Sequence, residues 1–196
     1  MGKVETNKKQ KNTTLLQTSF ELFTEKGFTK TTISDIVNRA GLAKGTFYLY
    51  FKDKYELQDV LLAKTSHELF SKACKEATQQ QFDRLDDKIV FIIDSIINEL
   101  IVRPNILKFI QKNLSLGLYS EKLTDLLDSE ELGIKELFVN EVKEKDIPLE
   151  YPEMTLFMII ELVSSTVFTS IVESHPLPIE EFKPHLYKTI RLLINE

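Results

Sequence analysis

Apolar residues along this chain recur at intervals of three and four, which is the spacing of one face of an α-helix. Leu16, Phe20 and Phe23 keep this spacing near the start, and a run of isoleucines from Ile89 to Ile97 keeps it later. No strand-length alternation of apolar and polar residues occurs, and most of the six glycines and six prolines fall between or at the ends of the periodic segments. The pattern predicts an all-α fold of about nine helices.

Caps and breakers at the segment ends give the bounds of the expected helices. We expect helices over residues 11–26, 33–40, 44–50, 53–77, 84–102, 104–117, 121–145, 153–173 and 179–195. Gly27 is expected to end the first, because glycine tolerates the left-handed backbone at a helix C-terminus. Thr32 and Asp35 predict a capping box for the second helix. Pro184 is expected to delay or bend the last.

The second and third helices are short and are joined by a tight turn at Gly41, which is typical of a helix-turn-helix. Phe47 and Phe51 lie four residues apart and are expected to hold the third helix against its own core. Four side chains are then left for DNA, namely Lys44, Thr46, Tyr48 and Tyr50. Gly45 has no side chain, so its backbone can approach a phosphate closely.

The charge is unevenly distributed, although the chain as a whole carries −5. Residues 1–54 hold ten basic and five acidic residues, so this part is +5 and the remainder is −10. Such a division is typical of a phosphate-facing module joined to an acidic body, and equally compatible with a solvated basic end. The basic cluster Lys8, Lys9 and Lys11 either follows the minor groove or forms a solvated, flexible arm.

Residues Gly27 to Ile33 and Gly41 to Leu57 together resemble the DNA-binding region of the TetR family of transcriptional regulators. The resemblance covers residues 11–60, and the rest of the chain is similar in architecture alone. It implies a three-helix DNA-binding domain over residues 1–54, joined by a long helix to an effector-binding and dimerisation domain over residues 55–196.

The resemblance also implies roles for individual residues. Thr32 would contact a phosphate, Ser34 and Lys44 would lie near base edges, and Leu49 could meet a thymine methyl group. The backbone contacts would come from Thr46, Tyr48 and Lys54. Two positions depart from the family pattern: Ala43 gives the third helix no side-chain cap, and Ser34 is shorter than the arginine or lysine that reads a base.

A regulator of this kind responds to a ligand that binds one of its two states more tightly. The long helix that starts at Asp53 is the expected lever. An apolar effector is the favoured ligand, and the candidate contacts are Phe91, Phe109, Phe138 and Phe157. Asp87, Asp94, Ser95, Asn98 and Glu99 fall on one stripe of their helix, which favours a solvated face over a set of pocket groups.

A homodimer is expected from the last two helices, which by resemblance form a four-helix interface between subunits. Its predicted residues are Ser164, Ser165, Phe168, Phe182, Leu186, Ile190 and Leu193. Small residues such as the two serines let helices approach closely.

Several function classes are not supported by the sequence. The single cysteine, Cys74, and three scattered histidines give no metal cluster, so no metal, cofactor or catalytic residue is predicted. The N-terminus has no apolar signal core, and no apolar stretch is long enough for a membrane span. We therefore predict a cytoplasmic, non-enzymatic regulator that binds double-stranded DNA, by default a repressor. The alternative is a helical adaptor or activator that acts through protein partners without a small-molecule effector.

Overall fold

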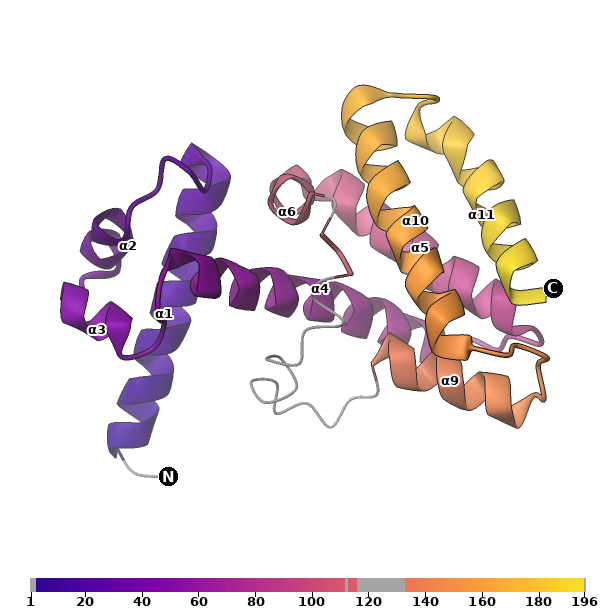
Figure 1. Ribbon diagram of the computed structural model, residues 1–196, viewed down its shortest axis with the longest axis horizontal. Helices are drawn as coiled ribbons and strands as arrows, with labels where there is room; N and C mark the ends of the chain where they lie inside the picture. The colour runs from indigo at the N-terminus through magenta and orange to yellow at the C-terminus, as the bar shows by residue number, and fades with distance from the viewer. Residues whose placement is uncertain (1–2, 112, 116–132, 196) are drawn as a thin grey trace. The chain divides into compact units, whose positions relative to one another are not determined.

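The structure, a computed structural model, describes residues 3–111, 113–115 and 133–195, and every regular element among them is a helix. The all-α prediction is confirmed (Figure 1). The chain forms two compact units, Met1–Leu62 and Ala63–Glu196. The functional division after residue 54 stays a prediction.

The N-terminal unit contains α1 (Lys3–Lys26), α2 (Ile33–Ala40), α3 (Lys44–Tyr48) and the first turns of α4 (Lys54–Thr78). Its core is apolar and fully enclosed; the side chains that share it include Leu15, Leu22, Phe23, Ile36, Val37, Phe47, Phe51 and Leu57. These residues recur at helical spacing, so burying one face of each helix brings α1, α2 and α3 together.

The turns in this unit follow the expected chemistry. Gly27 and Gly41 have φ of 84° and 66°, a left-handed backbone that only glycine adopts without strain. The amide of Leu42 donates to the carbonyl of Val37 at 2.9 Å and that of Gly41 donates to Asn38 at 3.2 Å, which closes α2 with a Schellman motif. The chain therefore turns sharply between α2 and α3.

The C-terminal unit contains the rest of α4 and five further helices in its described part. These are α5 (Leu85–Val102), α6 (Pro104–Ile110), α9 (Ile134–Glu144), α10 (Pro152–Glu173) and α11 (Ile179–Asn195). The centre is α5, whose isoleucines from Ile89 to Ile97 are buried and which packs against α6, α9, α10 and α11. A helix that is apolar on a broad face takes this central place because several neighbours are needed to cover it.

Some helix bounds differ from the prediction. α1 begins at Lys3, eight residues earlier than expected, and α6 ends at Ile110 because Gln111 takes φ of 50°. The expected end of the helix over 104–117 and the expected start of the helix over 121–145 lie outside the described residues. Pro184 does not delay α11, which starts at Ile179 and contains the proline.

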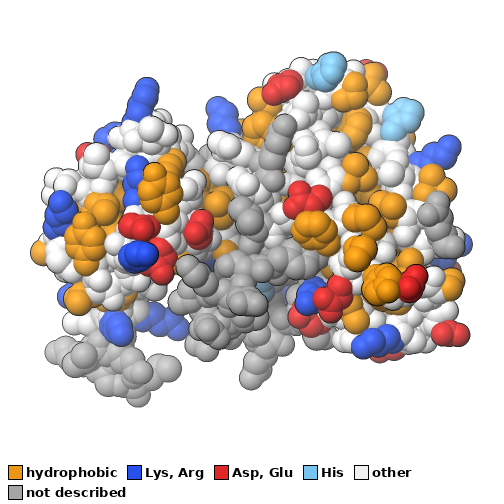
Figure 2. Space-filling model, viewed as in Figure 1, with side chains coloured by type: hydrophobic (Ala, Val, Ile, Leu, Met, Phe, Trp, Pro, Cys, Tyr) orange, Lys and Arg blue, Asp and Glu red, His pale blue; other side chains and the backbone are white. Residues whose placement is uncertain are grey.

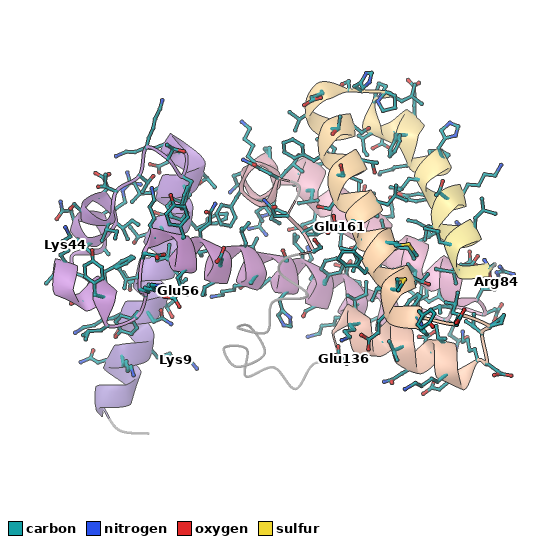
Figure 3. All side chains as sticks on the ribbon, viewed as in Figure 1. Lys9, Lys44, Glu56, Arg84, Glu136 and Glu161 are labelled. Carbon is teal, nitrogen blue, oxygen red and sulfur yellow. The ribbon has the colours of Figure 1, made fainter. Side chains whose placement is uncertain are left out.

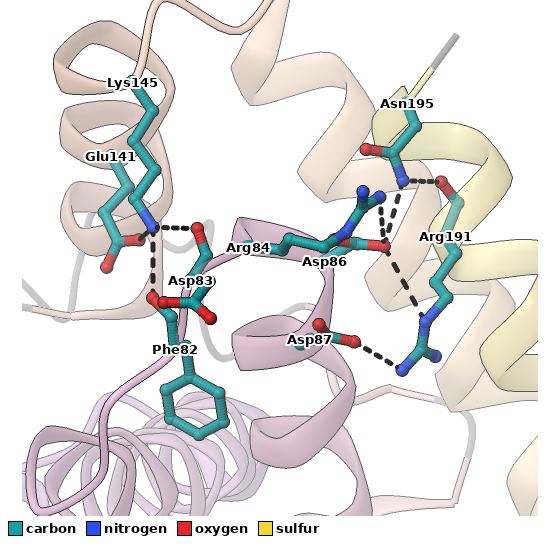
Figure 4. A network of polar contacts seen from close by, with 9 residues as sticks. All are labelled: Phe82, Asp83, Arg84, Asp86, Asp87, Glu141, Lys145, Arg191 and Asn195. Atoms are coloured by element: carbon teal, nitrogen blue, oxygen red, sulfur yellow. Dashed lines mark hydrogen bonds and ion pairs between the residues drawn. The ribbon is translucent and has the colours of Figure 1, made fainter.

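Polar side chains join α5 to α11 at the start of α5 (Figure 4). Asp86 is 2% exposed and accepts from Nε and Nη2 of Arg84 at 2.9 and 3.1 Å, and from Asn195 Nδ2 at 3.0 Å. Arg191 lies 3.7 Å from Asp86 and donates to Asp87 at 2.7 Å. Charge-assisted hydrogen bonds thus replace the water that this buried carboxylate gives up.

A second polar cluster lies further along the same two helices. Lys183, which is 9% exposed, donates to Asn98 Oδ1 at 2.7 Å and lies 3.2 Å from Asp94. The Tyr187 hydroxyl also donates to Asp94. The stripe is therefore only partly solvated: Asn98 is exposed and the Asp87 and Asp94 side chains are 44% and 39% exposed, while Lys183 and Tyr187 of α11 cover part of it. The members that α11 leaves free bind elsewhere: Ser95 donates to Glu76, and Glu99 pairs with Lys72 and Arg103.

Candidate nucleic-acid interface

Thr32 starts α2 as the predicted capping box. Its hydroxyl accepts from the Asp35 amide at 3.1 Å, and its own amide donates to Asp35 Oδ2 at 2.9 Å. Hydrogen bonds from the Thr32 backbone, and then from its hydroxyl, lower the pKa of Asp35. The cap is confirmed, and the exposed edge of Thr32 stays available for the predicted phosphate contact.

Aromatic rings hold α3 from behind. Phe47 is fully buried and Phe51 is 5% exposed, with ring centroids 5.8 Å apart. On the opposite side Tyr48 is 52% exposed and Leu49 78% exposed. Lys44 is exposed too and lies at the edge of the unit in Figure 3. The expected division of α3 into a buried aromatic face and an outward-facing polar one is confirmed.

Neither the backbone conformation nor the described neighbouring atoms require a glycine at position 45. A Cβ built at this position meets no atom within 4 Å, and its φ is not positive. The backbone at Gly45 is therefore an open surface. Ala43, the residue before α3, makes no side-chain capping bond, as expected.

Two predicted contacts already have partners inside the unit. Lys54 Nζ donates to the carbonyls of Phe28 and Thr31, both at 2.7 Å, and lies 4.2 Å from the centroid of the Phe28 ring. The Tyr50 hydroxyl donates to the carbonyl of Lys8 in α1 at 3.0 Å. Sequence reasoning missed both interactions, because they join residues 23 to 42 positions apart and no local pattern marks them.

The structure brings all the predicted DNA contacts into the N-terminal unit. Those that are exposed are Thr32, Ser34, Lys44, Gly45, Tyr48 and Leu49, while Thr46, Tyr50 and Lys54 are half-buried. Contact with DNA stays a prediction for each of them, and Lys54 and Tyr50 already form the bonds described above.

The C-terminal unit has a cavity of about 420 Å³ between α4, α5 and α9. It is lined by Ser71, Cys74, Lys75 and Thr78 of α4, Lys88 of α5, and Leu137, Asn140, Glu141 and Glu144 of α9. Lys88 and Glu141 form an ion pair across it. Burial raises the pKa of the Cys74 thiol to about 11, so this group stays protonated and unreactive at neutral pH.

None of the four predicted effector contacts lines this cavity. Phe138 is fully buried in the core and Phe109 is 8% exposed, whereas Phe157 is 43% exposed on α10. Phe91 packs against Phe82 with ring centroids 5.4 Å apart. The structure therefore places the four rings in different surroundings on α5, α6, α9 and α10.

The predicted dimer residues differ in burial: some are enclosed within the subunit and others are exposed or half-buried. Leu186 and Ile190 are 2% and 0% exposed, since α11 packs against α5 and α10 within the same chain, and Ser164 is buried where it accepts from the Leu114 amide. This corrects the interpretation of Leu186 and Ile190 as a surface seam. Ser165 is exposed, and the half-buried members are Phe168, Phe182 and Leu193.

Comparisons with known proteins match the N-terminal unit most closely. Residues 15–60 fit the sequence model of bacterial regulatory proteins of the tetR family. The HTH-type transcriptional regulator YvdT of Bacillus subtilis is 56% identical over 43 residues, which are 22% of this chain and 22% of that relative. The match therefore spans about a fifth of the relative's length.

Solved structures extend the likeness of fold over both units. A TetR-family transcriptional regulator from Syntrophomonas wolfei superposes with a TM-score of 0.65 at 18% identity, covering 95% of each chain. The regulator FadR from Bacillus subtilis, in complex with stearoyl-CoA, gives 0.61 at 18% identity over 93% of this chain and 97% of that one. Residues 15–60 therefore match the DNA-binding region of the tetR family of bacterial regulatory proteins, and the chain shares its fold with solved TetR-family regulators.

Proposed function

We propose that the chain is a cytoplasmic repressor that binds operator DNA through α2 and α3. The observation that carries this proposal is the exposed face of α3, where Lys44, Tyr48 and Leu49 point outward although Leu49 is an apolar side chain. An exposed leucine beside a cation and a hydroxyl suits a major groove, which offers thymine methyl groups, phosphates and base edges together. The open backbone at Gly45 supports close approach of a phosphate.

The test is binding of the full chain to a mixed-sequence duplex that spans two successive major grooves, followed by fluorescence anisotropy over about 50–200 mM salt. We expect affinity to fall steeply with salt, because phosphate contacts release counterions. Tyr48→Ala should weaken binding about tenfold or more without changing the unfolding midpoint. The matched control is Tyr151→Ala, which removes a tyrosine of similar exposure (59%) from the other unit. Salt-independent binding, or equal effects of the two substitutions, would exclude the proposal.

A small effector is the second part of the proposal. The cavity between α4, α5 and α9 has the volume that drug-sized ligands occupy. Most of its lining surface is apolar, while Lys75, Lys88, Glu141 and Glu144 supply charged groups, so it suits a ligand with an apolar body and a polar end. The stearoyl-CoA held by the structurally similar FadR is a ligand of that description, and acyl-CoA thioesters are the class we would examine first.

A homodimer is the third part. Met154, Met158 and Val172 are 44–56% exposed on α10, and with Phe157 they recur at helical spacing along one face. Figure 2 shows hydrophobic side chains along this helix. By length and composition α10 could also cross a membrane, and eight of its side chains are buried within the unit. A second copy of α10 is the cover we propose for its exposed face.

A further inference from the structure

Residues 7–11 of α1 are helical although none of their side chains packs in the core of the unit. Residues 7–11 are all exposed, and the first fully buried side chain of the helix is Leu15. A helical segment that is polar on every side gains nothing from packing, and short helices in water are marginal by themselves. In Figure 1 this end of α1 continues past α3, on the side away from α2.

Tyr50 links this segment to the helix-turn-helix. Its side chain comes from just after α3, and its hydroxyl donates to the Lys8 carbonyl at 3.0 Å. The bond fixes the exposed first turns of α1 next to the C-terminal end of α3. Figure 3 shows Lys9 on this part of α1, within the same unit as Lys44.

The cations of this segment have no acidic partners in the described part of the chain. Lys8, Lys9 and Lys11 are exposed and form none of the ion pairs of the N-terminal unit, which are Lys26–Asp35 and Arg39–Glu25. The sequence from Thr6 to Phe20 contains no acidic residue. Among the residues whose side chains the structure describes, no acidic group therefore neutralises these three positive charges, which lie within one helical turn beside a helix whose outward face is proposed to enter a groove.

We propose that Lys8, Lys9 and Lys11 form a second phosphate-binding surface, positioned by Tyr50, that grips the DNA backbone beside the groove occupied by α3. The proposal rests on the proposed function. Lysine ammonium groups bind phosphates as point charges, so these contacts add affinity and orientation and carry no sequence information. Tyr50 is a positioning residue in this arrangement, since its hydroxyl donor is already directed at α1.

The experiment measures the salt dependence of full-chain binding to the same mixed-sequence duplex. Each lost phosphate contact lowers the slope of log affinity against log salt by about 0.9. We expect the triple variant K8Q/K9Q/K11Q to lower it by about 1.8–2.7, for two to three contacts. The affinity ratio between native chain and variant would then narrow by about 10- to 40-fold between 50 and 200 mM salt.

The matched control is K108Q/K143Q/K188Q, which removes the same charge from three exposed lysines of the C-terminal unit. Equal slopes for the two triple variants would mean a net-charge effect and would overturn the inference. If the native chain binds with a steep slope that K8Q/K9Q/K11Q leaves unchanged, the inference fails and the proposed function stands. If the native chain shows no salt-dependent binding, the proposed function itself fails.

Tyr50→Phe tests the positioning role, because it removes the hydroxyl and keeps the ring. We expect it to lower the slope in the native background and to have no effect when K8Q/K9Q/K11Q is already present. An equal effect in both backgrounds would show that the hydroxyl touches DNA directly, and would overturn the positioning role of Tyr50.

Discussion

Lys54 illustrates how a single side chain in this fold is used. In the turn between α1 and α2 the Phe28 carbonyl accepts from the Thr31 amide at 3.2 Å, and the Lys54 ammonium donates to this carbonyl and to that of Thr31, both at 2.7 Å, while lying over the Phe28 ring. Hydrogen bonds to charged groups contribute more than neutral ones, especially where the acceptors are partly buried. The ammonium has a third N–H, so a DNA contact and this role are compatible in principle.

We expect Lys54→Met to destabilise the protein by about 1.5–3 kcal/mol, because two carbonyls lose a charged donor. The measurement is the free energy of unfolding in urea. Lys52→Met is the control, since it changes an exposed lysine two residues away. Equal stability of the two variants would contradict the structural role and leave phosphate binding as the reason for a lysine at this position.

At the scale of helices, local chemistry determines what the sequence can predict. Thr32 with Asp35, Gly41, and Asp53 set helix ends through bonds to residues within five positions, so these ends are visible in the sequence. The start of α1 depends on no such local signal, and the expected start at residue 11 was wrong.

The partners of the polar side chains on α5 could not be predicted, for a related reason. A charged side chain facing solvent and one facing an arginine on a distant helix have the same local pattern. Asp86 and Arg191 are 105 positions apart, and their proximity follows only from the packing of α11 on α5. The α3 face, in contrast, was predictable because Phe47 and Phe51 identify its buried side directly.

The polar contacts between α5 and α11 predict how the stability of the protein depends on pH. For Asp86, burial is the largest effect and opposes ionisation of the carboxyl group. The hydrogen bonds from Arg84 and Asn195 together outweigh burial, so the pKa of Asp86 is lowered. The pKa of Asp94 is lowered in the same way: burial opposes ionisation, and hydrogen bonds from Tyr187 and Lys183 favour it. A carboxylate with a lowered pKa stabilises the fold above its unfolded-state pKa of about 4, and this contribution is lost as pH falls through the folded value.

We therefore expect Asp86→Asn to lower the free energy of unfolding at pH 7 by about 1–3 kcal/mol, a modest value because Arg84 and Arg191 are well exposed. The variant should also lose less stability than the native chain between about pH 5 and 3. Urea unfolding at a series of pH values measures both effects. Asp59→Asn, at an exposed aspartate, is the control. If the free energy of unfolding of Asp86→Asn fell as steeply between pH 5 and 3 as that of the native chain, this account would be contradicted.

At the scale of the whole molecule, DNA recognition and the exposed face of α10 make one common demand. Two helix-turn-helix units meet successive major grooves only if a dimer holds them about 34–36 Å apart. The burial of Leu186 and Ile190 inside the subunit moves the expected interface away from that part of α11 and onto α10. There the exposed set Met154, Phe157, Met158 and Val172 has Ser165 midway along the helix, where a small side chain permits close approach.

A charge placed at the middle of this face should separate the subunits, because a glutamate buried against a second copy of α10 would lose its hydration without gaining a partner. We expect the native chain to have twice its 22.7 kDa mass in light scattering at micromolar concentration, and Met158→Glu to have the single-chain mass while remaining helical. Val102→Glu is the matched control, since Val102 is an exposed apolar residue (78%) at the end of α5. If Met158→Glu stayed dimeric, the subunits would have to meet on another surface; a monomeric native chain would remove the dimer altogether. Because paired recognition helices are needed for tight operator binding, the monomeric variant should also lose affinity for a two-groove duplex, while each unit retains its fold.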